Sequence, residues 1–305
     1  MRFAVETWAP EYGAPMEPEM EASDVAVDIG VELPGDAWRP LESDVTPAAD
    51  VVFVDGVRRI DANVWIDDGP EPPIYGVCAA YAAGAVRCNG RADIVSALVE
   101  RSLFTSARTA AIIETRHGGY GVVPTVGSAP EDLWIAIQKR MGILEGRVSA
   151  ALEGSSMVIV DGPLSHHQQV DGAVGYVKSQ HVHHLPPEVR GILREIPVGR
   201  RTPIFLVGGA RQVFSWYLRL AAPGGPMSGV VRCEVAAVGT AAEAASVASR
   251  VTATLPRFSS DEHKDPRAPQ NLYPIGGLER ELRHRLGDQM LMYRALRRAA
   301  VTPVP

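Results

Sequence analysis

The chain contains few cysteines and no long apolar run. Its three cysteines, Cys78, Cys88 and Cys233, are odd in number and form no CxxC pair. This argues against a disulfide framework or a zinc ribbon, and it is typical of a reducing compartment. The first ten residues lack the apolar segment of a signal peptide, and the most apolar window, residues 75–86, is too short to span a bilayer. We therefore expect a cytoplasmic protein without a membrane segment.

The chain also lacks net positive charge: its formal net charge is −6, which by itself disfavours a nucleic-acid partner. The acidic residues are concentrated at the N-terminus, however. Residues 1–50 contain 12 Asp or Glu and 2 Arg, whereas residues 51–305 contain 24 acidic and 28 basic residues, a net charge of +4. We expect an acidic, partly irregular lead-in over residues 1–49 and a main domain over residues 50–305. The charge of the main domain permits contacts with phosphate groups.

Two short runs in the chain are similar to each other. Residues 51–56 read VVFVDG and residues 157–162 read MVIVDG. Each is apolar, rich in β-branched residues and ends in Asp-Gly, which predicts a buried strand followed by a turn. If the two strands are parallel neighbours, Asp55 and Asp161 emerge at the same edge of the sheet. Two carboxylates that close repel each other unless a proton or cation lies between them, and a divalent cation with oxygen ligands fits such a pair. Taken alone, either run is better explained as an ordinary strand-to-turn transition, and it is the pair that favours a functional site.

The order of the other predicted elements indicates an α/β fold. Residues 51–86 predict three sequential strands, and residues 130–153 predict a helix with Glu145 at the edge of its apolar stripe. Helical spacing of apolar residues also predicts a helix over residues 93–104, and residues 278–299 predict one long basic amphipathic helix. This order matches a ribonuclease-H-like mixed sheet flanked by helices, with insertions and a C-terminal helix. In that plan the first and fourth strands are neighbours, and the helix before the fourth strand brings Glu145 to the same edge.

These segments together resemble the NurA nuclease family, a ribonuclease-H-like or PIWI-like group, from about residue 50 to about residue 300. The matching pieces are FVDG at 53–56, Glu145, IVDGPL at 159–164, GYVK at 175–178, WYLRL at 216–220, VRCEV at 231–235, and Asp265 followed by YPI at 273–275. The resemblance implies a DNA nuclease that depends on Mn²⁺ or Mg²⁺. It also implies a homodimer that acts with a HerA-type hexameric ATPase in DNA end processing or phage defence.

Two positions depart from the pattern of this family. The family usually has a small hydroxyl residue after the first Asp-Gly, where this chain has Val57. It usually has a histidine after the late Tyr-Pro, and the nearest position here is Glu279. These departures leave open a second interpretation, a catalytically degenerate DNA-binding or scaffold module of the same fold.

The chemistry of phosphodiester cleavage gives each acidic residue an expected role. The reaction needs an activated water, a stabilised leaving oxygen and neutralised charge, and two divalent cations about 3.5–4 Å apart supply all three. We expect Asp55 to bridge both cations. Asp161 and Glu145 would hold one cation and Asp265 the other. Lys178, at a strand end, would bind the scissile phosphate as a point charge.

Each of these residues also has a plainer interpretation. Glu145 can be part of an ion pair at the edge of the helix, Lys178 a solvated lysine, and Asp265 part of a polar loop. A further alternative is a zinc-dependent hydrolase that uses the histidine-rich segments, His166, His167, His181, His183 and His184, but no CxxC or HExxH partner supports it. The arginines of the last predicted helix could contact phosphates. The interleaved Glu281 and Asp288 favour a solvated, salt-bridged face instead.

Overall fold

The structure is a computed structural model of the chain, and it divides into two compact units. Unit 1 comprises residues 1–53, 87–93 and 153–276, and unit 2 comprises residues 54–86, 94–152 and 277–305. Within these spans the structure describes residues 21–22, 25–69, 72–152, 157–164, 172–178, 182–209, 212–222, 225, 227–261 and 263–301. The boundary between the units passes through three long strands of one sheet.

Most strands belong to a single mixed sheet. They are β2 (Val27–Asp28), β3 (Val51–Ile66), β4 (Ile74–Cys88), β5 (Ala92–Thr105), β6 (Ile113–Thr115), β7 (Gly118–Pro124), β8 (Val158–Asp161), β9 (Ala173–Val177), β11 (Phe205–Val207), β12 (Val213–Arg219) and β13 (Val230–Ala236). Their hydrogen-bonded order is β2-β11-β12-β13-β9-β8-β3-β4-β5-β7-β6. The β8–β9 and β5–β7 pairs are parallel, whereas β9–β13, β13–β12 and β12–β11 are antiparallel. The predicted α/β class with a mixed sheet is thus confirmed, and its ribonuclease-H-like assignment stays a prediction.

In unit 1, short helices cover the strands from β8 to β2. They are α2 (Pro187–Arg190), α3 (Ile192–Glu195) and α4 (Ala241–Thr254), with 3₁₀ turns η1 (Gly35–Ala37) and η3 (Leu255–Phe258). Side chains of α2 and α3, including Leu193, share a buried apolar cluster with Phe205 and Tyr217. Helix α4 begins with a capping box, in which the Thr240 and Glu243 side chains each bond the other's backbone N–H. A separate two-stranded parallel sheet pairs β1 (Glu21–Ala22) with β10 (Val182–His183).

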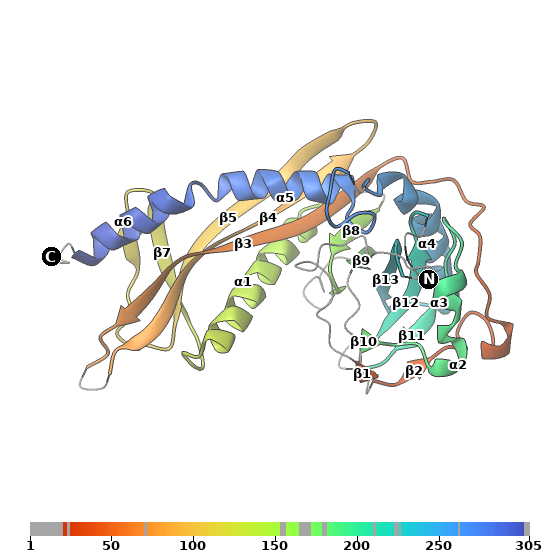
Figure 1. The fold of residues 1–305 in the computed structure, drawn as a ribbon, viewed down its shortest axis with the longest axis horizontal. Helices are drawn as coiled ribbons and strands as arrows, with labels where there is room; N and C mark the ends of the chain where they lie inside the picture. Colours follow the sequence, from red (N-terminus) through yellow and green to blue (C-terminus); the bar gives the residue numbers. More distant parts are fainter. Residues whose placement is uncertain are drawn as a thin grey trace, which may run out of the picture. The chain divides into compact units, whose positions relative to one another are not determined.

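In unit 2, three helices pack on the long strands β3 to β5. Figure 1 shows α1 (Pro130–Ala150) on one side of these strands, and α5 (Tyr273–Arg285) followed by α6 (Gln289–Val301) along the other. Small residues of β4 allow this close packing. A Cβ added at Gly84 would lie 2.9 Å from the Ser96 carbonyl oxygen and 3.0 Å from Leu282 Cδ2 of α5. Within the described residues, no helix combines the length and apolarity needed to cross a membrane.

Three of the predictions about helices and strands were wrong. The three strands predicted from residue 51 to residue 86 are two, because residues 51–66 form one continuous strand, β3, before β4. The helix predicted over residues 93–104 is strand β5, which lies between β4 and β7. The residues of β5 change from exposed near Ala92 to buried near Thr105. Apolar and polar residues therefore do not alternate along the sequence as they do in a half-buried strand. The single helix predicted over residues 278–299 is two helices. Gly287 has φ +81° between them, and the Asp288 carboxylate accepts a hydrogen bond from the N–H of Leu291 in the first turn of α6.

A buried carboxylate connects β3 to its neighbours in unit 2. Asp61 accepts hydrogen bonds from Arg59 Nε at 2.7 Å and from the Tyr120 hydroxyl at 2.8 Å, and its side chain is fully buried. Arg59 also donates to the carbonyl oxygens of Gly287 and Leu286 at the end of α5. Burial, together with the bond to Asp61, raises the pKa of Tyr120 well above its ordinary value, so the hydroxyl stays a donor. The network thus satisfies carbonyl groups that a helix leaves unpaired at its C-terminus.

This network predicts a large loss of stability on Asp61→Ala. The substitution leaves the Arg59 guanidinium and the Tyr120 hydroxyl without their buried acceptor, and breaking a buried pair in this way costs about 3–5 kcal/mol. The control is Glu281→Ala on α5, which removes an exposed partner of Arg285 and costs less than about 1 kcal/mol. Urea unfolding followed by tryptophan fluorescence measures both. Equal losses for the two variants would contradict the role given to Asp61.

Candidate metal centre

The two strands that end in Asp-Gly lie side by side. Strands β3 and β8 are neighbours in the sheet, and the N–H of Val52 donates to the Met157 carbonyl oxygen at 2.9 Å. Asp55 and Asp161 follow this contact by three and four residues. The apolar residues before each aspartate are buried, which fixes both strands in the core. The prediction that these strands are neighbours is confirmed.

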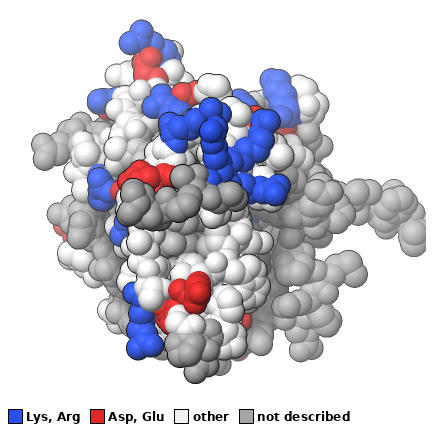
Figure 2. Space-filling model, turned by 90° about the vertical axis from the view of Figure 1, so that its left-hand side faces the viewer, with Lys and Arg blue, Asp and Glu red and all other residues white. Residues whose placement is uncertain are grey.

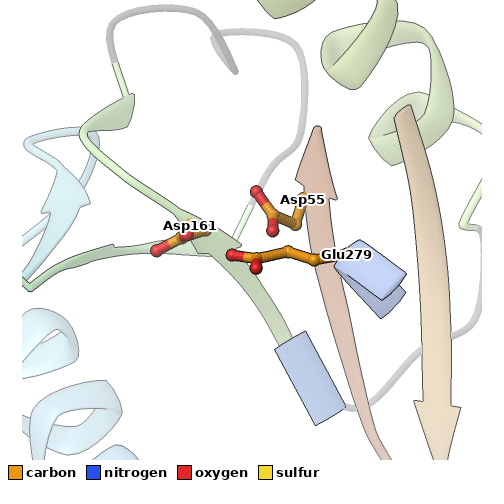
Figure 3. A group of neighbouring side chains, drawn as sticks. All are labelled: Asp55, Asp161 and Glu279. Atoms are coloured by element: carbon orange, nitrogen blue, oxygen red, sulfur yellow. The ribbon is translucent and has the colours of Figure 1, made fainter. Parts of the chain in front are cut away.

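Three carboxylates lie together at this place (Figure 3). Asp55 from β3, Asp161 from the end of β8 and Glu279 from α5 each offer one oxygen, and these oxygens lie within 4.8 Å of one another. Asp55 and Glu279 are buried and Asp161 is partly buried. Like charges so close raise the free energy of the folded chain unless a proton or cation neutralises them. The arrangement is therefore a candidate cation site.

The donor set fits a hard divalent cation. All three donors are carboxylate oxygens, the ligands that Mg²⁺ and Mn²⁺ prefer, whereas thiolate or imidazole ligands would favour zinc or copper. A cation with bonds of about 2.1 Å in octahedral geometry has ligand oxygens about 3–4.2 Å apart. The upper limit of 4.8 Å between the three oxygens is close to that range. Small side-chain rotations are enough to let the three carboxylates share one ion.

The predicted ligand Glu145 belongs to α1 and packs against Gly56 of β3. It is buried on α1, and a Cβ added at Gly56 would come within 2.2 Å of its Oε1 atom. Successive strand residues face opposite sides, so the face of β3 toward Glu145 is opposite to the face of Asp55. Arg58 lies on the Glu145 side and stacks its guanidinium over Trp134 at 4.2 Å. Burial lowers the pKa of Arg58, and the charge of Glu145 partly opposes this shift.

Helix α5 covers the other face of β3. Asp55 and Arg59 share that face because they are four residues apart on one strand. Arg59 bonds the end of α5, and Glu279 lies on the same helix. This explains why the described residues group Asp55 with Glu279 and not with Glu145. Glu145 as a metal ligand stays a prediction.

Lys178 lies against Asp161, a contact that the sequence analysis did not predict. Its Nζ atom is 2.6 Å from Asp161 Oδ2, and both side chains are mostly buried, with 13% and 15% of their surfaces exposed. The ammonium also donates to Asn271 Oδ1 at 3.0 Å. An ion pair this well shielded is stronger than a surface pair, because water screens it less. Lys178 therefore holds the Asp161 carboxylate in place.

Asp265 lies in the loop between η3 and α5. Its carboxylate accepts hydrogen bonds from Asn271 Nδ2 at 2.5 Å and from the N–H of Arg267 at 2.8 Å. Burial alone would raise the pKa of Asp265, but these bonds and the charge of Arg267 outweigh it and keep the pKa below its ordinary value. Asp265 is outside the group of three carboxylates found among the described residues. Its role as a ligand stays a prediction.

The remaining predicted residues are distributed as follows. His166, His167 and His181, and the side chain of His183, lie outside the described residues, so the zinc alternative stays a prediction. The arginines predicted to contact phosphates are exposed: Arg280, Arg283, Arg285, Arg294, Arg297 and Arg298. Arg285 pairs with Glu281 at 2.8 Å, as expected of a solvated face. Lys and Arg side chains also gather on the face drawn in Figure 2, so this surface of unit 2 can attract phosphate groups.

Glu279 is the candidate ligand that the sequence analysis did not select. It stands in a helix with three arginines and a second glutamate between residues 280 and 285, which is typical of a solvated face. Two signals could have found it: it is the position nearest to the late histidine of the resembled family, and its spacing places it beside the apolar stripe. Ile275, Leu278, Leu282 and Leu286 are all buried, and Glu279 follows Ile275 by four residues, so it lies on the buried side of α5.

The fold and the carboxylate group define an α/β protein with a site suited to a hard divalent cation. The model of the NurA domain family matches residues 49–275, which is most of the chain. The chain therefore belongs to the NurA family, a family of nucleases, and the resemblance found from the sequence is confirmed. Comparison with curated proteins finds no match. Glu279 lies four residues beyond the matched span, so its place in the site comes from the structure and not from the family match.

The close approach of Glu145 to Gly56 predicts the effect of Gly56→Ala. The new methyl group would overlap the Glu145 carboxylate, and overpacking of this kind costs about 1–3 kcal/mol of unfolding free energy. Adding Glu145→Ala removes the overlapping atoms, so the double variant is more stable than the sum of the single effects predicts. Gly121→Ala in β7, where a Cβ meets no atom within 4 Å, is the matched control. Strictly additive losses in urea unfolding would contradict this packing.

Proposed function

We propose that this protein is a DNA nuclease that depends on Mn²⁺ or Mg²⁺, with Asp55, Asp161 and Glu279 holding the cation. The observation that carries the proposal is the group of three carboxylate oxygens within 4.8 Å of one another, in a chain that belongs to a nuclease family. A protein that only binds DNA gains nothing from buried like charges at this place. A nuclease needs them, because they fix a cation where phosphate charge must be neutralised.

Each residue of the site has its own role in the proposed phosphodiester hydrolysis. When bound, a divalent cation supplies charge neutralisation at the phosphate and lowers the pKa of a coordinated water. The N–H of Gly56 donates to Asp55 Oδ1 at 2.7 Å, which orients that carboxylate at the turn. Lys178 orients Asp161, and its ammonium can also contact a phosphate oxygen of the substrate. Glu279 completes the ligand set from α5.

The other predicted ligands, Glu145 and Asp265, belong to a second cation in this proposal. Asp55 would help to hold this second cation as well, and Glu145 or Asp265 would be the further residue that holds it. In the structure the Asp265 carboxylate is held by Asn271 and Arg267, while Glu145 packs against Gly56. A site for one cation, held by Asp55, Asp161 and Glu279, needs neither of these two residues.

The expected context of the reaction follows from the family. We propose that the protein acts as a cytoplasmic homodimer on DNA, together with a HerA-like hexameric ATPase, in DNA end processing or phage defence, and that its core is ribonuclease-H-like. Membership of the NurA family supports these points, as does the charge of +4 over residues 51–305. The three cysteines are free and buried, which is consistent with a reducing compartment.

A matched pair of substitutions on α5 tests the proposed site. Glu279→Gln removes one charged ligand, so we expect Mn²⁺ binding weaker by roughly tenfold and a comparable or larger loss of cleavage of linear DNA. Glu281→Gln lies two residues further on the same helix, pairs with Arg285 at the surface, and leaves both quantities unchanged. Calorimetry with Mn²⁺ and a gel-based nuclease assay measure them.

Two outcomes would contradict the proposal in different ways. Equal Mn²⁺ affinity and activity in Glu279→Gln and the wild-type protein would remove Glu279 from the site. Absence of cleavage of single- and double-stranded DNA by the wild-type protein, with Mn²⁺ or Mg²⁺ present, would exclude the nuclease activity. That second result would favour the scaffold or DNA-binding interpretation of the same fold.

A further inference from the structure

A chain of polar contacts in unit 1 leads from Asp161 into the loop before α5. Lys178 Nζ lies 2.6 Å from Asp161 Oδ2 and donates to Asn271 Oδ1 at 3.0 Å. Asn271 Nδ2 in turn donates to Asp265 Oδ2 at 2.5 Å. Asn271 is fully buried, so these contacts are not exchanged for contacts with water. Arg267 closes the chain by donating its N–H to the other Asp265 oxygen.

The polarity of these contacts requires an amide at position 271. The Lys178 ammonium can only donate hydrogen bonds, and an ionised Asp265 carboxylate can only accept them. A primary amide carries an acceptor and two donors, so Asn271 can face the ammonium with its oxygen and the carboxylate with its nitrogen. A carboxylate at this position would meet Asp265 with like charge, and an apolar side chain would remove one hydrogen bond from each of the two neighbours. The side chain is therefore fixed in one orientation by its two neighbours.

The loop around Asn271 is itself anchored. A β-bridge between Ser259 and Leu272 closes the loop at its base. The Tyr176 hydroxyl of β9 donates to the Gln270 carbonyl oxygen, next to Asn271. This buried contact and the Lys178 bond tie the loop to β9, the strand that pairs with β8. Asn271 is therefore held at a fixed distance from the strand that carries Lys178.

We propose that Asn271 is a positioning residue that holds Lys178 against Asp161, and that Asp265 orients Asn271. A lysine side chain has four rotatable carbon bonds, so one contact with Asp161 leaves its ammonium free to rotate about that contact. The second contact, to Asn271, fixes the ammonium and with it the Asp161 carboxylate. The structural part of this inference stands alone, and its effect on cleavage rests on the proposed nuclease function.

The first test measures the Lys178 side chain directly and needs no nuclease activity. The chain has only three lysines, Lys139, Lys178 and Lys264, so pulsed acetylation with an N-hydroxysuccinimide ester followed by mass spectrometry resolves each one. Lys139 and Lys264 are exposed and serve as internal standards. In Asn271→Leu we expect the acetylation rate of Lys178, relative to Lys139, to rise about tenfold, as loss of one charge-assisted hydrogen bond implies.

A control variant separates this effect from general loss of stability. Ser215→Ala removes buried hydrogen bonds to Arg232 and to the Cys233 carbonyl group, elsewhere in the same unit. It should leave the relative rate at Lys178 at the wild-type value. An unchanged rate in folded Asn271→Leu, or an equal rise in Ser215→Ala, would overturn the proposal.

The second test exchanges the amide side chain of Asn271 and the carboxylate side chain of Asp265. Asn271→Asp alone places two carboxylates in contact, and we expect kcat for Mn²⁺-dependent DNA cleavage to fall about 10- to 100-fold with little change in KM. Combining it with Asp265→Asn puts the amide and the carboxylate in each other's places. The ammonium then meets a carboxylate oxygen, and the new amide donates to that carboxylate. The kcat of the double variant should be at least about ten times the kcat of Asn271→Asp.

The outcomes of this exchange decide between positioning and metal ligation. A double variant as slow as Asn271→Asp would overturn the positioning role. Asn271→Asp should keep wild-type Mn²⁺ affinity in calorimetry, because Asn271 contacts Lys178 and Asp265 and is not part of the group of three carboxylates. A roughly tenfold loss of Mn²⁺ affinity in this variant would place position 271 in the cation site and overturn the positioning role. If the wild-type protein cleaves no DNA, the nuclease function fails, and the acetylation rates still decide the position of Lys178.

Discussion

Repulsion between like charges is the constraint on which the site depends. Asp55, Asp161 and Glu279 present carboxylate oxygens within 4.8 Å of one another, and such a group is stable only with compensating positive charge or shared protons. The structure supplies part of that compensation through the Lys178 ammonium on Asp161. Buried strands on either side prevent the aspartates from moving apart into solvent. The divalent cation that we propose would supply the rest of this compensation.

The sequence predicted the two aspartates of the site and not its glutamate, for a physical reason. Asp55 and Asp161 each end a run of β-branched residues, and a charged residue in that position is unusual enough to be noticed without coordinates. Glu279 stands among arginines on an amphipathic helix, where most glutamates are solvated. Which face of β3 this helix covers depends on tertiary packing, here on the contact of Arg59 with the end of α5. That contact joins residues more than 200 positions apart and has no local signature.

The difference between local sequence signals and tertiary packing also explains which helices and strands were predicted wrongly. The residues of strand β5 change from exposed at its start to buried at its end. The strand therefore lacks the alternation of exposed and buried residues that marks a half-buried strand, and its apolar residues were taken for a helical pattern. The break between α5 and α6 has a local cause, Gly287 followed by a capping aspartate, and was readable in principle. The bond from Lys178 to Asn271, by contrast, joins positions 93 apart, so neither spacing nor composition could indicate it.

Anomalous X-ray diffraction at the manganese absorption edge, from crystals soaked in Mn²⁺, shows directly which residues bind the cation. If the three carboxylates share one cation, a strong anomalous peak lies within bonding distance, about 2.1–2.2 Å, of one oxygen each from Asp55, Asp161 and Glu279. A peak bound by other residues, or no peak at millimolar Mn²⁺, would contradict the claim that these three carboxylates share a cation.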